Sequence, residues 1–301
     1  MALMQLSTGL KKMSYSLNDN ELQGIGKHGR LRLCFTRQDG KTILNDSFST
    51  IPMCAFQPFY LDETGCAYSY IVNPTSGLVG GDKIEIGITI DNNAHAFITT
   101  PSATKVYKSS KDFSHQDTEI FVKKNGILEY LPGYVIPFAG SLYSQKMKVY
   151  MEESSTAFIL DSFTTGRNAR GEHLSFKEYR SRTEIIYCDE PVVTERILLR
   201  PDIEDYDDLG FFESFTAVAV LYLIFDNLSL QCPLIADIKG LLDKADDIIG
   251  GVSALPSNGI LVRFLSKGVI PLTRIVYSIF PIFRKRVLCL DTTSSLNRFF
   301  L

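Results

Sequence analysis

The stretch SGLVGGDKIEIGITI, residues 76 to 90, decides the fold class. In its second half isoleucine occupies every second position from Ile84 to Ile90, and the polar residues Glu85 and Thr89 stand between them. Successive side chains of a strand point to opposite faces, so a period of two predicts a strand with one buried face.

The same alternation recurs on both sides of this stretch. Four further segments show it: TEIFVK (118–123), QKMKVYM (145–151), TEIIYCD (183–189) and VVTERILL (192–199). Turn residues separate them, as in DNN from Asp91 and KNG from Lys124. Many short strands at roughly ten-residue spacing are typical of a sandwich, a barrel or a stacked β-solenoid. No repeat motif is legible, so periodicity alone leaves these three open.

The glycines before the strand resemble a phosphate-binding loop only at first sight. A Walker loop requires GxxxxGK[ST] followed by a helix, and a Rossmann turn requires GxGxxG leading into a helix. Here Asp82 stands near the place of the lysine, and a strand follows. We therefore interpret GLVGGD as a tight connection in which glycine permits close backbone approach.

After about residue 206 the pattern changes. FTAVAVLYLIF (215–225) predicts a buried strand, because its eleven residues are too few to span a bilayer. PLIADIKGLLDKADDIIGG (233–251) predicts a helix that Gly250 and Gly251 end, and GILVRFLS (259–266) predicts a strand.

PLTRIVYSIFPIFRKR (271–286) predicts a second helix, kinked at Pro281 and ending on the cations Arg284 to Arg286. We expect a β-α-β-β-α order in this region, which predicts a small C-terminal α/β part. We place the division in the acidic loop PDIEDYDDLG (201–210), giving a β-rich domain over 1–205 and a two-helix subdomain over 206–301.

Composition excludes several classes of function. The 301 residues carry a formal net charge of −3 and a pI near 5.9, which argues against nucleic acid as a partner. The N-terminus lacks a secretory signal, and we expect no membrane partner. Six scattered cysteines without a CxxC pair predict buried free thiols in a reducing cytoplasm.

Motifs of catalysis are missing from the sequence. It holds neither a GxSxG elbow nor HExxH. The four histidines, His28, His95, His115 and His173, are far apart, and none stands at ligand spacing from a second His or a Cys, which favours structural roles. Asp161 and Glu172 suggest one alternative, the acid and base of a carbohydrate-active β-solenoid enzyme, but their spacing fixes no geometry.

Several blocks, in order from about Pro58 to the C-terminus, resemble the urease accessory protein UreD family, called UreH in some bacteria. They are NPTSGLVGGDKIEI, AFITTPSATKVYKSS, LEYLPGYVIPFAGS, FILDSFTTGRNARGE, EPVVTERILL, GILVRFLS and LNRFFL. Leu160 replaces an aromatic residue that the family often has, and the acidic loop near Asp205 is particular to this chain.

The resemblance implies a mainly β fold: a β-helix-like stack of short strands with a small C-terminal part containing two helices. It implies a non-enzymatic metallochaperone scaffold for inserting nickel into urease. Such a protein binds UreF and, through it, the GTPase UreG, docks on apo-urease and conducts nickel to its active site; a dimer of such complexes is left open. No cofactor is expected to bind tightly, nickel is transient, and GTP acts only through the partner.

A path that conducts nickel must bind the ion weakly, and weak binding favours carboxylate ligands over clusters of Cys and His. The candidates near the family blocks are Asp62, Glu63, Glu129, Asp161 and Glu172. The resemblance also implies a surface or channel wall formed by Gly80, Gly81, Asp82, Thr100, Pro101, Lys105, Tyr107, Gly166 and Arg167. Each acid has a competing structural interpretation, pairing with a basic residue such as Arg167. A docking surface is expected to expose apolar side chains, with Phe56, Phe59, Tyr60 and Phe138 as candidates.

Overall fold

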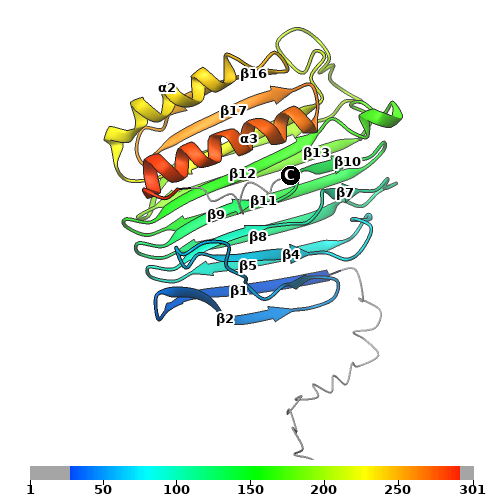
Figure 1. Cartoon of the computed structure of the whole chain (residues 1–301). Helices are drawn as coiled ribbons and strands as arrows, with labels where there is room; N and C mark the ends of the chain where they lie inside the picture. The colour runs from blue at the N-terminus through cyan, green and yellow to red at the C-terminus, as the bar shows by residue number, and fades with distance from the viewer. Residues whose placement is uncertain (1–27, 292–301) are drawn as a thin grey trace, which may run out of the picture.

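The computed structural model describes residues 28–291, and its strands form two large sheets (Figure 1). The first sheet has the order β14-β13-β11-β8-β5-β1-β2. Its strands are β1 (His28–Gln38), β2 (Lys41–Ser49), β5 (Lys83–Ile90), β8 (Ser114–Val122), β11 (Leu142–Met151), β13 (Glu178–Tyr187) and β14 (Glu190–Leu199).

The second sheet has the order β16-β17-β15-β12-β9-β6-β4-β3. Its strands are β3 (Cys54–Ala55), β4 (Ala67–Val72), β6 (His95–Thr99), β9 (Ile127–Leu131), β12 (Thr156–Thr164), β15 (Ala217–Ile224), β16 (Ile248–Ala254) and β17 (Ile260–Ser266). Two short strands, β7 (Thr104–Val106) and β10 (Val135–Pro137), pair beside the end of β12.

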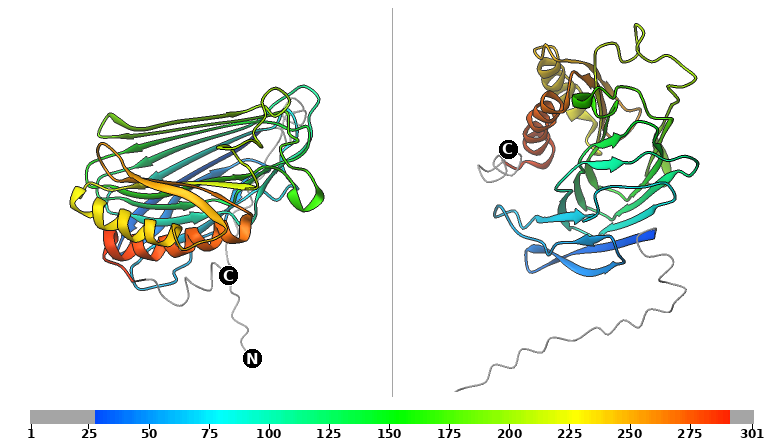
Figure 2. Two further views of the ribbon diagram at one scale, coloured as in Figure 1. Left: turned by 90° about the horizontal axis from the view of Figure 1, so that it is seen from above. Right: turned by 90° about the vertical axis from the view of Figure 1, so that its right-hand side faces the viewer.

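The chain coils between the two sheets. From β4 to β13 successive long strands alternate between them, and each pairs in parallel with the strand one coil earlier. Ala67, Ala96, Leu128 and Ala157 therefore occupy the same position in successive coils. This is the expected β-helix-like stack, and Figure 2 shows the two layers on edge. The repeat is illegible in sequence because the register is held by backbone hydrogen bonds rather than by recurring side chains.

The inner faces of the sheets form the main core. Ile84, Ile86, Ile88 and Ile90 are all at most 6% exposed, which confirms the predicted buried face of β5. All eight residues of β15 are buried, as predicted for the apolar run. The cysteines found in residues 28–291 are all free, but only Cys66 is buried, and the prediction of buried thiols was wrong for the exposed Cys188, Cys232 and Cys289.

Antiparallel strands complete both sheets. β2 and β14 flank the parallel strands of the first sheet, and β15, β17 and β16 extend the second sheet beyond β12. The C-terminal elements have the predicted β-α-β-β-α order. Their strands extend the second sheet, which also contains strands of the coil. The division between two domains at residues 205/206 stays a prediction.

Two helices pack on the outer face of the second sheet, over its β15, β16 and β17 end (Figures 1 and 2). They are α2 (Gln231–Leu242) and α3 (Val269–Phe283), and they enclose a second core cluster. Three 3₁₀ or π turns complete the regular structure: η1 (Asn168–Arg170), η2 (Leu228–Leu230) and the π-helix η3 (Arg284–Leu288). In residues 28–291 no helix is both long and apolar enough to cross a membrane.

The predicted end of the first C-terminal helix was wrong. The helix ends at Leu242, and Gly250 and Gly251 lie in β16. Gly250 is required there by packing, because a Cβ would lie 2.3 Å from the Cβ of Phe264 on β17. Glycine thus marks close strand approach here instead of a helix stop.

The end of the second helix also differs from expectation. α3 continues through Pro281 to Phe283, and η3 follows directly. Lys285 and Arg286 are exposed, but Arg284 is fully buried. The helix dipole therefore does not explain the position of Arg284, because the hydrogen-bond partners of this residue lie in the β coil.

Candidate functional site

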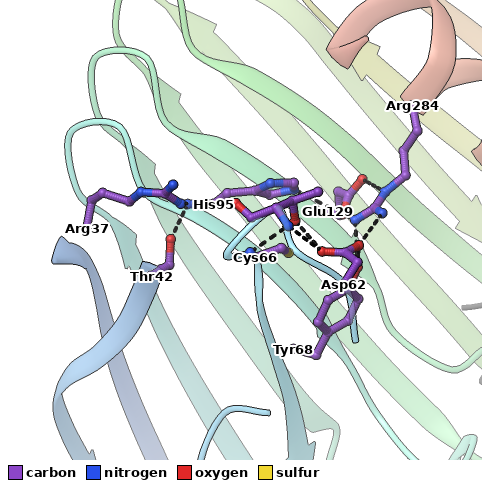
Figure 3. Close-up of polar contacts among 9 residues, drawn as sticks. Arg37, Thr42, Asp62, Cys66, Tyr68, His95, Glu129 and Arg284 are labelled. Atoms are coloured by element: carbon purple, nitrogen blue, oxygen red, sulfur yellow. Dashed lines mark hydrogen bonds and ion pairs between the residues drawn. The ribbon is translucent and has the colours of Figure 1, made fainter. Parts of the chain in front are cut away.

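Arg284 lies at the centre of a buried polar cluster beneath α3 (Figure 3). Its Nε donates to Oε1 of Glu129 at 2.7 Å, and its Nη2 donates to Oε2 at 2.6 Å. Nη1 lies 3.3 Å from Oδ2 of Asp62, and Nη2 donates to the Tyr68 hydroxyl at 2.9 Å. Both carboxylates are almost completely buried, so the cluster is a desolvated ion network.

Strand alternation explains why these polar side chains meet. Leu128 and Tyr130 of β9 point into the inner core, so Glu129 points to the helix-covered face. On β6, Ala96 and Ile98 point inward and His95 outward by the same rule. Because β6 and β9 are parallel neighbours, these two outward residues lie close together although they are offset by two positions in the register.

The registers place specific neighbours side by side. Ala67 pairs with Ala96, so Cys66, which precedes β4, lies next to His95. Phe97 pairs with Glu129, one strand further along. Nε2 of His95 lies 3.2 Å from Oε2 of Glu129.

The network strongly shifts the ionisation of its members. Burial alone would raise the pKa of Glu129, but the Arg284 guanidinium outweighs burial and lowers this pKa to about 2. Burial also opposes ionisation of Asp62, whose pKa is nevertheless lowered by hydrogen bonds from Thr64 and Tyr68 and by Arg284. Burial raises the pKa of the Cys66 thiol well above its usual range.

Three potential metal ligands lie together in this cluster. The Cys66 Sγ, a His95 ring nitrogen and a Glu129 carboxylate oxygen are all within 4.8 Å of one another. The prediction of a structural role for His95 did not anticipate that Cys66 would lie beside it. It rested on spacing along the chain, whereas the coil brings together residues of successive turns; the outward positions of the β strands would have revealed the pair once their register was known.

Asp161 occupies a different place, in the interior between the two sheets. The Nε2 of Gln145 donates to its carboxylate oxygens at 2.9 and 3.1 Å, and Oγ of Ser181 donates at 3.2 Å. Burial raises the pKa of Asp161, partly offset by these hydrogen bonds. No cation contacts the carboxylate among the ion pairs of the described residues.

This carboxylate borders a cavity of about 140 Å³ whose lining includes exposed residues such as Thr75 and Pro101. The cavity wall includes Thr100, Pro101 and Lys105 from the family-like block, together with Gly77. The structure therefore brings three of the expected wall residues together with one expected nickel-path carboxylate.

Glu172 has a different environment again. Nε of Arg167 donates to it at 2.8 Å, Nη2 of Arg167 forms a second bond, and the Ala139 amide donates at 3.1 Å. The Arg167 guanidinium also lies 4.0 Å from the centre of the Phe138 ring. Glu172 and Asp161 share no hydrogen-bond partner, so the structure does not unite them as an acid and base pair.

The remaining expected residues are structural or exposed. The Val79 amide donates to Oδ2 of Asp82 at 2.9 Å, closing the glycine-rich turn. A Cβ on Gly80 would lie 2.2 Å from Oγ of Ser109, so this turn requires close approach. Glu63 is exposed and is not one of the residues that hydrogen-bond to Arg284.

Gly81 lies in the same turn, whereas Gly166 lies in the bend after β12. Gly81 and Gly166 have positive φ, and the Tyr107 hydroxyl donates to the Ser76 carbonyl at 3.3 Å. Of the apolar docking candidates, Phe56 and Tyr60 are exposed, Phe59 is half-buried and Phe138 is buried.

Comparison with known proteins gives a consistent result. The family model described as "UreD urease accessory protein" matches residues 27–296. Proteins named urease accessory protein UreD are similar along most of their length. The protein of Bacillus cereus is 30% identical over 79% of this chain and 86% of its own. The protein of Corynebacterium glutamicum is 32% identical over 78% of this chain and 83% of its own. The protein of Streptococcus salivarius is 28% identical over 86% of this chain and 92% of its own. With its coiled two-sheet fold and family blocks in order, the chain belongs to the UreD urease accessory protein family.

Proposed function

We propose that this chain is a non-catalytic, cytoplasmic scaffold that helps to insert nickel into urease. In this proposal it binds UreF and, through UreF, the GTPase UreG, and the complex docks on apo-urease. GTP acts only on the partner, and nickel is transient cargo. Membership of an accessory-protein family supports the general role.

One observation carries the nickel step: the cavity beside Asp161. Its wall combines polar side chains, backbone turns and one carboxylate that no cation neutralises among the described ion pairs. A carboxylate held by amide and hydroxyl donors can bind a divalent ion weakly, and weak binding suits an ion that must leave again. Asp161 is therefore the first residue to test.

The test is Asp161→Asn, which keeps the shape of the side chain and removes its charge. Wild-type and variant chains are coexpressed with UreF, UreG and urease, and complex recovery, urease activity and urease-bound nickel are measured. We expect intact complexes with at least tenfold less bound nickel. Full activation together with an intact complex would remove Asp161 from the path.

Glu172→Gln is the matched control. This change breaks the Arg167 pair at a half-buried site away from the Asp161 hydrogen bonds. We expect near-normal nickel content, or loss of the complex and the nickel together. Selective nickel loss with an intact complex would place Glu172 on the path as well.

The enzyme alternative makes the opposite prediction. An acid and base pair at Asp161 and Glu172 would give turnover by the isolated chain. Their separate partners argue against this pairing. Turnover of a β-glycan that either substitution abolishes would overturn the scaffold proposal.

A further inference from the structure

The Cys66, His95 and Glu129 side chains have the chemistry of a divalent-metal site separate from the Asp161 cavity. Thiolate, imidazole and carboxylate together favour Zn²⁺, Co²⁺ or Ni²⁺ over Mg²⁺ or Ca²⁺. All three residues are buried, which excludes the frequent case of unrelated groups gathered on a surface. We propose that these three side chains bind one such ion directly.

The geometry is close to what the ion requires. Metal bonds of about 2.0 to 2.3 Å in a tetrahedral site place ligand atoms roughly 3.3 to 3.6 Å apart. Nε2 of His95 and Oε2 of Glu129 are already 3.2 Å apart. The Cys66 Sγ, within 4.8 Å of both ligands, needs a shift of about 1 Å.

The charges of the cluster also suit a divalent ion. Arg284 contributes one positive charge, and Glu129 and Asp62 contribute two negative charges. Metal binding releases the Cys66 thiol proton to solvent and adds a third negative charge, because a coordinating thiol is deprotonated. With neutral His95, a divalent ion brings the buried group to zero net charge.

Arg284 remains as the outer partner of the site. It uses both oxygens of Glu129, and Nε holds Oε1 at 2.7 Å while Oε2 also faces His95. On binding, the metal takes the place of the hydrogen bond between His95 and Glu129, and Oε1 stays on Arg284. Such second partners orient a ligand and typically change metal affinity 10- to 100-fold.

Co²⁺ is the probe, because a cobalt–thiolate bond gives a charge-transfer absorption that oxygen and nitrogen ligands do not give. The full chain is titrated with Co²⁺ by absorption and equilibrium dialysis. We expect one ion per chain with this absorption. Its absence from the wild-type chain at saturating Co²⁺ would overturn the site.

Cys66→Ser and Cys188→Ser form the matched pair, since Cys188 is exposed and lies outside the cluster. We expect the absorption to disappear only in Cys66→Ser, with thermal unfolding confirming that both variants fold. Retention of the band in Cys66→Ser would refute the assignment. If Cys66→Ser fails to fold, Cys66→Ala replaces it, because alanine leaves only a small cavity in place of the thiol.

Asp62→Asn tests the charge argument without touching a ligand. We expect the Kd for Co²⁺ to rise tenfold or more, and an unchanged Kd would contradict the charge balance. This site goes beyond the proposed nickel transit. Loss of cobalt binding would leave the Asp161 experiment unaffected, and failure of that experiment would leave this site standing.

Discussion

Arg284 donates two hydrogen bonds to Glu129, which precedes it by 155 residues. One residue lies in the π-helix that follows α3, and the other lies in β9 of the coil. Together with Asp62, Glu129 neutralises a guanidinium that has no exposed surface. The C-terminal helical part is thus fixed to the β coil by a charged contact as well as by apolar packing.

Removing the Arg284 charge should therefore destabilise the fold strongly. We expect Arg284→Gln to lower the free energy of unfolding by about 3 to 5 kcal/mol, because it leaves Glu129 and Asp62 buried without their cation. Equilibrium urea denaturation of the full chain measures this loss. Arg286→Gln is the control: its pair with Asp237 is exposed, so we expect a loss below about 1 kcal/mol. Similar losses in both variants would contradict a special role for the buried pair.

Glu129 predicts a specific acid sensitivity. Its pKa falls from the ordinary value of 4.5 to about 2 in the folded chain, because Arg284 outweighs the effect of burial. The folded state therefore gains stability above pH 4.5 and loses it as the pH falls from 4.5 toward 2. The difference is on the order of 3 kcal/mol.

Urea denaturation at several pH values tests this sign. Between pH 5 and pH 2.5 the wild-type chain should lose more stability than Glu129→Gln, which has no proton to gain at this position. Parallel curves for the two proteins would contradict the pKa of Glu129.

Sequence patterns predicted the strands better than the site. Isoleucine alternation identified β5 because burial on one face leaves a period of two, and the apolar run identified β15. Resemblance to a known family, rather than periodicity, selected the β-helix-like stack. The end of the first C-terminal helix was predicted wrongly at Gly250, because glycine occurs both at helix ends and where strands approach closely.

The Arg284 cluster shows why the rest was not predicted. Asp62 and Glu129 were candidates on composition and family position, but their cation comes from a distant helix end. Cys66 and His95 meet through strand register, which no local spacing encodes. Long-range pairing of this kind requires the coil to be known first.

The two faces of β5 should respond differently to mutation. Ile86 is 6% exposed within the inner core, so Ile86→Asp buries a charge without a partner and should cost roughly 3 kcal/mol or more. Glu85 lies on the outer face among Lys83, Arg30 and His28. We expect Glu85→Gln to cost less than about 1 kcal/mol. Equal losses in urea denaturation would mean that β5 is buried on both faces.

The glycine-rich turn offers a test of close packing. In Gly80→Ala, the new Cβ would lie 2.2 Å from Oγ and 2.9 Å from Cβ of Ser109. The turn must shift to accept it, and such overpacking typically costs about 1 to 3 kcal/mol. We expect a loss of this size in the free energy of unfolding, measured by urea denaturation.

A second substitution shows whether the contact with Ser109 causes that loss. Ser109→Gly removes both clashing atoms, so the double variant should lose less than the sum of the two single variants. Gly251→Ala is the control, because a Cβ there meets nothing within 4 Å and the backbone is not left-handed. We expect Gly251→Ala to change stability by less than about 0.5 kcal/mol. Strict additivity of Gly80→Ala and Ser109→Gly would mean that the turn requires glycine for another reason.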